Sequence, residues 1–266
     1  VKITFTSGST ATPKGVCLSA PSLESVATSL AEATADFGLT RHLCLLPLAT
    51  LLENVGGIHA ALRSGASCII PSLTTTGMSY GGLEPQKLLA TISAHAPSSL
   101  ILVPELLRVL VMAAQKGWQP PASLRFIAVG GASVAPELLA SAARLGLPVF
   151  EGYGLSECGS VVCVNTATAQ RRGSVGRPLP HVRVRLDGQQ QILVSGPLMS
   201  GYLGDAAPAG AARGEIATGD LGEIDADGFV YVRGRLKNLI ITSLGRNISP
   251  EWVERELQTE AAIGMA

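Results

Sequence analysis

The sequence predicts an α/β protein whose core is a mostly parallel sheet with helices on both faces. Strand and helix signals alternate from residue 43 to residue 145, which is the pattern of successive strand-helix-strand units. After about Arg172 the signals change to short strands separated by Gly, Pro and Asp turns, which predicts a β-rich subdomain. The 266 residues are enough for one substantial core, because 47% are hydrophobic and only 15% are charged.

Hydrophobic periodicity and turn residues place the individual elements. A strand over Val1 to Phe5 leads into a polar loop, and the apolar face of Pro21 to Phe37 indicates a helix that begins after Ser19. We expect this helix to follow the loop directly and to aim its N-terminal dipole at it. The other α/β elements are expected at 43–48 (strand), 55–63 (helix), 67–71 (strand), 84–94 (helix), 100–103 (strand), 104–115 (helix), 126–129 (strand) and 136–145 (helix), and the β-rich strands at 182–186, 191–194, 222–225 and 229–233.

Composition excludes several classes of protein. The formal net charge is zero, which argues against a nucleic-acid binder or a protein of acidic membrane surfaces. The most apolar stretch, Leu100 to Ala114, is interrupted by Pro104, Glu105 and Arg108, so no transmembrane segment is expected. The five cysteines are scattered and form no C-x-x-C, which predicts reduced thiols in a cytoplasmic protein and argues against a metal cluster; they are Cys17, Cys44, Cys68, Cys158 and Cys163.

The stretch ITFTSGSTATPKGV, Ile3 to Val16, has the chemistry of a phosphate cradle. Glycines let backbone N–H groups approach an anion, hydroxyls donate hydrogen bonds to phosphate oxygens, and Lys14 supplies a mobile positive charge. It is not the usual P-loop, because Pro13 precedes the lysine and Gly15 follows it. An ordinary polar turn between a strand and a helix is the alternative interpretation.

Two further turns each follow a predicted strand. In AVGGASVAP, residues 128–136, Gly130, Gly131 and Ala132 leave room for a flat ring against the backbone, although a tight turn explains them equally well. In FEGYGLSECG, residues 150–159, Tyr153 can stack on a base and Glu157 can bind a hard cation. Either motif is weak by itself.

Two stretches in the last quarter of the chain complete the set. Asp220 follows Thr218 and Gly219, and Arg235 lies fifteen residues further on, across a predicted hairpin. Such an acid accepts hydrogen bonds from the paired hydroxyls of a ribose, and the arginine can reach the same sugar; a surface ion pair is the alternative. In SLGRNISPEWVEREL, residues 243–257, Ser249 and Pro250 predict the start of a helix.

In this order over Ile3 to Leu257, the five motifs resemble those of the adenylate-forming superfamily, which includes acyl-CoA synthetases, luciferases and peptide-synthetase adenylation domains. The phrase KNLIITSLGRNISPEWVE is most similar to acyl-CoA synthetases of the fatty-acid type. Two departures are visible: Ala11 stands where the family generally has glycine, and Ser156 replaces a threonine but keeps the hydroxyl.

The resemblance implies a role for each matched residue. It implies that Lys14, Ser156 and Glu157 are catalytic, with Ser156 at the α-phosphate and Glu157 on Mg²⁺, and that Lys237 is the hinge of a small C-terminal lid. It also implies nucleotide contacts to the phosphates from Thr6, Ser7, Gly8, Ser9 and Thr10, to adenine from Gly130, Gly131, Ala132, Tyr153 and Gly154, and to ribose from Asp220 and Arg235.

The implied reaction is a ligation in two steps. A carboxylate attacks the α-phosphate of Mg·ATP to give acyl-AMP and pyrophosphate, and CoA then displaces AMP to give the thioester. The partners are therefore a small carboxylic acid and CoA. The aliphatic side chains from Leu100 to Val129 suit an apolar, fatty-acid-type acyl group.

We expect residues 1–171 to form the α/β nucleotide- and acyl-binding core, 172–235 the β-rich subdomain, and 236–266 the hinge and the beginning of an incomplete lid. Measured against the family, the chain is expected to be cut at both ends and to lack the lid lysine. Exposed apolar surface at the cut ends predicts self-association. A non-catalytic protein that binds ATP, AMP or an acyl ligand, or that needs the missing segments in trans, is the alternative function. We favour the enzymatic function over a non-catalytic one. A protein that only binds a ligand or a partner has no need for four charged site residues together, namely Lys14, Glu157, Asp220 and Arg235.

Overall fold

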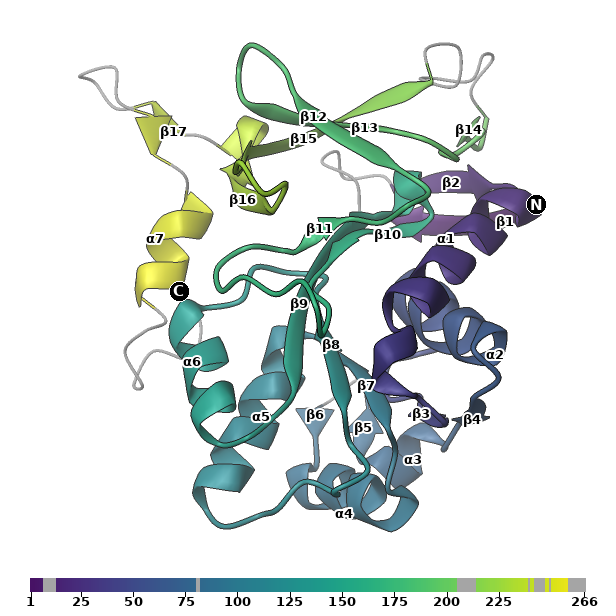
Figure 1. The fold of residues 1–266 in the computed structure, drawn as a ribbon, viewed down its shortest axis with the longest axis vertical. Coiled ribbons are helices and arrows are strands. Elements are labelled where there is room, and N and C mark those ends of the chain that lie inside the picture. The colour runs from purple at the N-terminus through teal and green to yellow at the C-terminus, as the bar shows by residue number, and fades with distance from the viewer. Residues whose placement is uncertain are drawn as a thin grey trace.

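The computed structural model describes residues 1–6, 13–79, 82–204, 214–238, 240–241, 247–248 and 250–257 (Figure 1). Its largest sheet has seven strands, which are in spatial order β11 (Arg177–Pro178), β10 (Ser160–Val164), β9 (Val149–Leu155), β8 (Phe126–Val129), β7 (Ser99–Leu102), β3 (Arg41–Leu43) and β4 (Ser67–Ile69). The strands from β9 to β4 are parallel, and β10 and β11 add an antiparallel edge. All four residues of β7 are buried, as expected of a central parallel strand.

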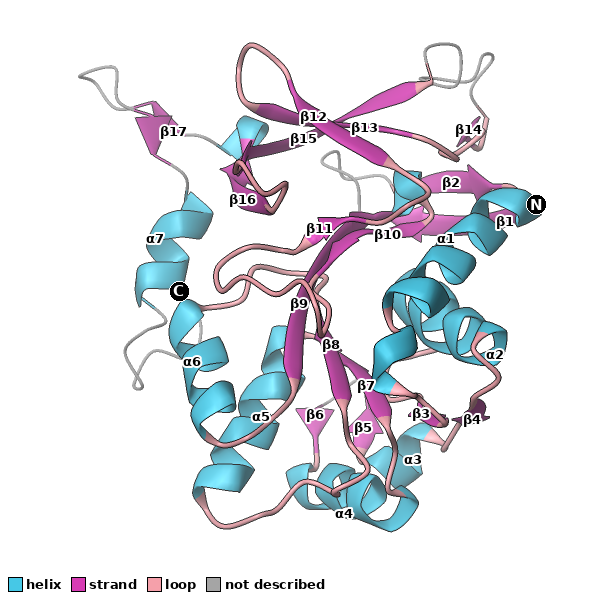
Figure 2. Cartoon of the chain, in the orientation of Figure 1, coloured by secondary structure: helices cyan, strands magenta, loops and turns pink. Residues whose placement is uncertain are grey.

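Helices cover both faces of this sheet (Figure 2). One face carries α1 (Ala20–Ala33), the 3₁₀ turn η1 (Ala35–Phe37), the π-helix η2 (Leu52–His59) and α2 (Ala60–Arg63). The other face carries α4 (Pro85–His95), α5 (Pro104–Gln115) and α6 (Pro136–Arg144). Each helical layer encloses its own hydrophobic cluster against the sheet. The predicted α/β class, with a mostly parallel sheet, is confirmed. No helix in the described part of the chain is both long and apolar enough to cross a membrane.

Helix α1 begins where the sequence predicts, but its surroundings differ from the expectation. Ser19 caps it by accepting a hydrogen bond from the Ser22 backbone N–H, at 3.2 Å. A strand, β2 (Lys14–Leu18), separates α1 from the polar loop and pairs antiparallel with β1 (Lys2–Thr6). The expectation that α1 follows the loop directly is therefore wrong, because β2 lies between them in the chain. The direction of the α1 dipole relative to the loop stays a prediction, because residues 7–12 lie outside the described part of the chain.

A second, antiparallel sheet lies beyond the large one and has the order β12 (Arg183–Leu186), β13 (Gln191–Ser195), β15 (Glu215–Ile224) and β16 (Val230–Arg235). Its residues Ile192, Val194 and Val230 belong to the same hydrophobic cluster as Val162 of β10. The two sheets therefore share a core. The division of the chain at residues 171 and 235 stays a prediction.

The remaining elements are short. The strand β14 (Gly201–Tyr202) joins the hairpin to form a sheet of order β1-β2-β14. Val1, which precedes β1, and Ile3 and Phe5 on β1 are exposed, and the predicted self-association stays a prediction. The others are α3 (Leu73–Thr76), β5 (Met78–Ser79), β6 (Gly82–Leu83), η3 (Ser156–Cys158), η4 (Leu236–Asn238), β17 (Ile240–Ile241), β18 (Asn247–Ile248) and α7 (Pro250–Leu257).

The strand predicted at 43–48 is displaced, for a reason that involves the interior. The strand ends at Leu43, although the Cys44 N–H still donates to the Ile69 carbonyl at 2.9 Å. The N–H groups of Leu45 and Leu46 then donate to the Glu53 carboxylate, at 3.2 and 2.9 Å. A buried acid thus replaces a neighbouring strand as the acceptor. The strand β10 was not predicted at all, and the strand expected at 222–225 is the end of the longer β15.

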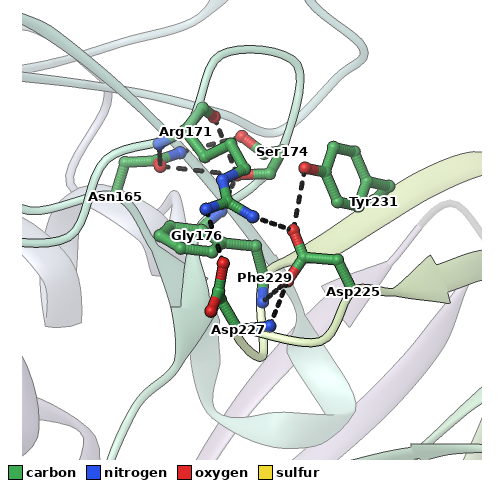
Figure 3. Close-up of polar contacts among 8 residues, drawn as sticks. All are labelled: Asn165, Arg171, Ser174, Gly176, Asp225, Asp227, Phe229 and Tyr231. Carbon is green, nitrogen blue, oxygen red and sulfur yellow. Dashed lines mark hydrogen bonds and ion pairs between the residues drawn. The ribbon is translucent and has the colours of Figure 1, made fainter.

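Arg171, in the loop after β10, binds the turn between β15 and β16 through ion pairs and a ring contact (Figure 3). Its guanidinium contacts Asp225 at 2.5 Å and Asp227 at 2.8 Å, and it lies over the Phe229 ring at 4.5 Å from the centroid. The Arg171 backbone N–H in turn donates to the Asn165 side chain at 2.9 Å. One end of the hairpin is therefore held to the large sheet.

His181, in the turn before β12, is expected to make the folded protein less stable in acid. Burial lowers its pKa from 6.5 to about 4, so between these values the unfolded chain binds a proton that the folded chain does not. We expect the free energy of unfolding to fall by on the order of 1 kcal/mol between about pH 7 and pH 5, a figure reduced because the ring is partly solvated. Urea denaturation of His181→Gln should show a shallower pH slope, whereas exposed His59→Gln should not; equal slopes for wild type and His181→Gln would contradict this.

Candidate active site

Asp220 lies at the centre of a polar cluster between the two sheets. It pairs in register with Arg235 across β15 and β16, and the Arg235 Nε donates to Asp220 Oδ1 at 2.8 Å. From β9, the Tyr153 hydroxyl donates to Asp220 Oδ2 at 2.6 Å. Asp220 is buried while the Arg235 side chain is half exposed. The structure therefore brings together three of the residues assigned to ribose and adenine, namely Tyr153, Asp220 and Arg235.

The Tyr153 phenol stays protonated and remains a donor. Burial raises its pKa, and the neighbouring Asp220 carboxylate raises that pKa further. Thr218, two residues before Asp220, supports the same cluster, because its Oγ1 accepts from the Asp220 N–H at 3.0 Å and donates to the Ile192 carbonyl at 2.9 Å. Whether the Tyr153 ring stacks on adenine stays a prediction.

A second polar cluster joins Lys14 to Glu157 through a residue that the sequence did not single out. Lys14 is the first residue of β2, opposite Thr6, and its Nζ lies 5.0 Å from the centroid of the Tyr202 ring. The Tyr202 hydroxyl donates to Glu157 Oε1 at 2.9 Å. Glu157 itself lies on η3, between Ser156 and Cys158. Ser7, Gly8, Ser9 and Thr10 lie outside the described residues.

The backbone favours glycine at three of the predicted binding positions. Gly131, after β8, has φ of 83°, and a Cβ on Gly130 would come within 3.0 Å of the Gly152 carbonyl oxygen. A Cβ on Gly154 would overlap the Ser160 carbonyl oxygen, at 1.7 Å. These three glycines line one cavity. Ala132 is exposed and is not one of the described residues that line it.

The cavity has a volume of about 280 Å³ and extends from the glycine turns into the space between the sheet, α1 and η2. Tyr153 and Ser156 line it near the two polar clusters. Its walls are mainly apolar, with Leu30, Leu51, Leu52, Leu100, Ile101, Phe126, Val129 and Val161 among the lining residues. The aliphatic contribution expected from residues 100–129 is therefore present.

One wall of the cavity is polar, which the sequence did not indicate. His42 of β3 lines it, with Nε2 2.7 Å from Glu53 Oε1 and Nδ1 3.1 Å from the Ser99 hydroxyl. Glu53 is fully buried, and η2 brings it to this position. A Cβ on Gly57, one turn along η2, would come within 2.3 Å of Glu53 Oε1, so the buried pair needs glycine there.

His42, Cys44 and Glu53 have the residue types of a metal site, and their ligand atoms lie within 4.8 Å of one another. Both carboxylate oxygens of Glu53 are already hydrogen-bond acceptors, from His42 and from two backbone N–H groups. Burial, followed by the nearby Glu53 charge, raises the pKa of the Cys44 thiol, which disfavours the thiolate that metals bind. The cluster is therefore a satisfied hydrogen-bond network.

Lys237 is exposed in the 3₁₀ turn η4, directly after β16. Its position next to Arg235 is compatible with a hinge, and that role stays a prediction. Residues 242–246, in the predicted lid, lie outside the described residues.

Glycine turns at the carboxyl ends of parallel strands, next to an apolar cavity, are typical of α/β proteins that bind nucleotides. A comparison with known families gives a more specific assignment than the fold and the site do. Residues 1–203 match the AMP-binding enzyme family, and the chain belongs to it.

Curated relatives are CoA ligases. Indoleacetate–CoA ligase of Aromatoleum aromaticum is 33% identical over 96% of this chain and 51% of its own length. 2-Succinylbenzoate–CoA ligase of Enterococcus faecalis is 31% identical over 99% of this chain and 55% of its own length. The chain thus spans about half the length of these relatives. Their names give aryl-type acids, so the expected fatty-acid type is not supported by them.

Solved structures agree in fold. The o-succinylbenzoate CoA synthetase of Bacillus subtilis in complex with its acyl-adenylate intermediate superimposes with a TM-score of 0.81 at 26% identity, over 99% of this chain and 55% of that one. The same enzyme in complex with ATP and a magnesium ion gives a TM-score of 0.78, with the same identity and coverage.

Proposed function

We propose that this protein activates a small carboxylic acid with ATP, as an acyl-adenylate, for transfer to CoA. One observation carries the proposal: a member of the Asp220 cluster and the chain neighbour of Glu157 line the same cavity. Tyr153 joins the first cluster to the cavity wall, and Ser156 joins the wall to Glu157. An acid in the cavity would then lie beside a nucleotide held by both clusters.

The residues near Glu157 fit a magnesium ion. Carboxylate oxygens are the ligands Mg²⁺ prefers, and among the described residues no hydrogen bond engages Glu157 Oε2. Bound Mg²⁺ supplies positive charge at the phosphates of ATP. Lys14 adds a cation on the other side of Tyr202. Together they would offset the repulsion between a carboxylate anion and polyphosphate.

The cavity favours a compact acid, aromatic or short-chain, over a long fatty acid. Its volume of about 280 Å³ is at the small end for ligand sites. Apolar walls suit a ring, while His42 and Ser99 provide a place for one polar substituent. The acids named for the relatives, indoleacetate and 2-succinylbenzoate, have this character.

Calorimetric titration tests the nucleotide site. Mg·ATP and a non-hydrolysable acyl-adenylate analogue should both bind the purified chain. Asp220→Ala should weaken binding by about tenfold or more, because it removes the acceptor for ribose hydroxyls and leaves Tyr153 and Arg235 without their shared partner. The matched control is Asp36→Ala, at an exposed acid in η1, which should bind like the wild type.

Pyrophosphate exchange with a panel of acids tests the chemistry. We expect exchange with aryl acids and with short acids, and little with acids of long chain. Nucleotide binding without exchange for any acid would favour the alternative, a binding protein that does not complete the reaction. Absence of nucleotide binding by a folded sample would reject the proposed enzyme and a nucleotide-binding protein, and would leave only the acyl-ligand and in-trans alternatives.

A further inference from the structure

Lys14 and Glu157 are opposite charges at one site, yet they do not pair. Every ion pair among the described residues joins other partners. A direct Lys14–Glu157 pair would neutralise both groups, and ATP and its metal would then have to break that pair before they could bind. Tyr202 lies between the two charges and contacts each of them.

The two contacts use different parts of the tyrosine. The hydroxyl donates to Glu157 Oε1 at 2.9 Å, which fixes one oxygen of the carboxylate. The ring face receives the Lys14 ammonium at 5.0 Å from its centroid, within the range of a cation–π interaction. The side chain is half buried, so both contacts are partly shielded from water.

Backbone pairing places Tyr202 there. In β14, Gly201 pairs with Cys17 and Tyr202 with Val16, two residues from Lys14 along β2. On the other side, the Met199 N–H donates to the Glu157 carbonyl at 2.8 Å. The segment is therefore tied to the strand that carries the lysine and to the turn that carries the glutamate.

We infer that Tyr202 is a positioning residue that holds Glu157 and Lys14 apart and oriented for Mg·ATP. This inference rests on the proposed function for the identity of the ligand. The hydroxyl orients Glu157 toward the metal, and the ring keeps the ammonium from the carboxylate. No other described residue contacts both groups through its side chain in this way.

Two variants separate the contacts. Tyr202→Phe keeps the ring and loses the hydroxyl, whereas Tyr202→Leu loses both. ATP binding is measured by calorimetry in EDTA and across a Mg²⁺ series, with Mn²⁺ binding followed by electron paramagnetic resonance. Tyr231→Phe is the matched control, since its hydroxyl donates to Asp225 in the distant Arg171 cluster.

For Tyr202→Phe we expect about tenfold weaker metal affinity, the size of effect seen when a group that orients a ligand is lost. Its binding of ATP in EDTA should stay within about twofold of wild type. Tyr202→Leu should lose affinity for the metal and for metal-free ATP, because Lys14 becomes free to pair with Glu157. Unchanged metal affinity in Tyr202→Phe, while wild type binds Mg·ATP, would overturn the inference and leave the proposed function intact.

A crystal structure of Tyr202→Leu tests the spacing without any ligand. The inference predicts a Lys14 Nζ to Glu157 carboxylate distance within about 4 Å, the range of an ion pair. Groups that stay separate in a folded variant would reject the spacing role. The crystal structure tests the spacing role even if the wild type binds no nucleotide. Absence of nucleotide binding would reject the proposed function and not the spacing role.

Discussion

Glu157→Ala is expected to reduce adenylation by about 10²-fold or more, the scale of losing a principal electrostatic contact. The substitution removes the carboxylate proposed for Mg²⁺ and also leaves the Tyr202 hydroxyl without its acceptor. Pyrophosphate exchange at saturating ATP measures the effect on rate. A Mg²⁺ series measures whether excess metal restores any of it.

A matched set of variants separates charge from shape. Glu157→Gln can still accept from Tyr202 but lacks the negative charge, so it should remain severely impaired if metal binding is the role. Glu24→Gln, at an exposed acid on α1 with a loose 3.7 Å ion pair to Arg63, should keep wild-type rates. If Glu157→Ala kept near-full activity, the proposed role of Glu157 in metal binding would be rejected.

Local signals predicted the helices better than the strands. The bounds of α5 are those predicted, because Pro104 marks its first turn and the apolar positions recur with helical spacing until Gln115. Strand β3 ends early because Glu53, ten residues further on, supplies acceptors that no local pattern reveals. β2 was read as part of the loop, since KGVCL is short and begins with a polar residue.

In the site, too, the residues marked by local motifs were predicted, and those whose roles depend on distant segments were missed. Asp220, Arg235 and Tyr153 were predicted because each sits in a short motif that the sequence shows, and the fold brings them within hydrogen-bond distance. Tyr202 and His42 were missed because their roles depend on pairings between distant segments. A lone tyrosine or a lone histidine in an apolar stretch carries no signal of its partners.

Glu53→Ala is expected to lower the free energy of unfolding by about 3–5 kcal/mol, as when one partner of a buried network is removed. The variant leaves His42 and the N–H groups of Leu45 and Leu46 without their acceptor in the interior. Guanidinium denaturation measures the loss. Glu32→Ala, at an exposed acid on α1, is the control and should change stability by less than about 0.5 kcal/mol.

Gly57→Ala tests the same network by crowding it. The added Cβ would lie 2.3 Å from Glu53 Oε1 and 2.6 Å from His42 Nε2, so η2 must shift or the pair must separate. We expect a loss of about 1–3 kcal/mol, the usual cost of overpacking. Because His42 lines the cavity, the acids accepted in pyrophosphate exchange should also change. If Glu53→Ala and Gly57→Ala both retained wild-type stability, the buried pair would not be what holds β3 to η2, and the polar wall of the cavity would need another explanation.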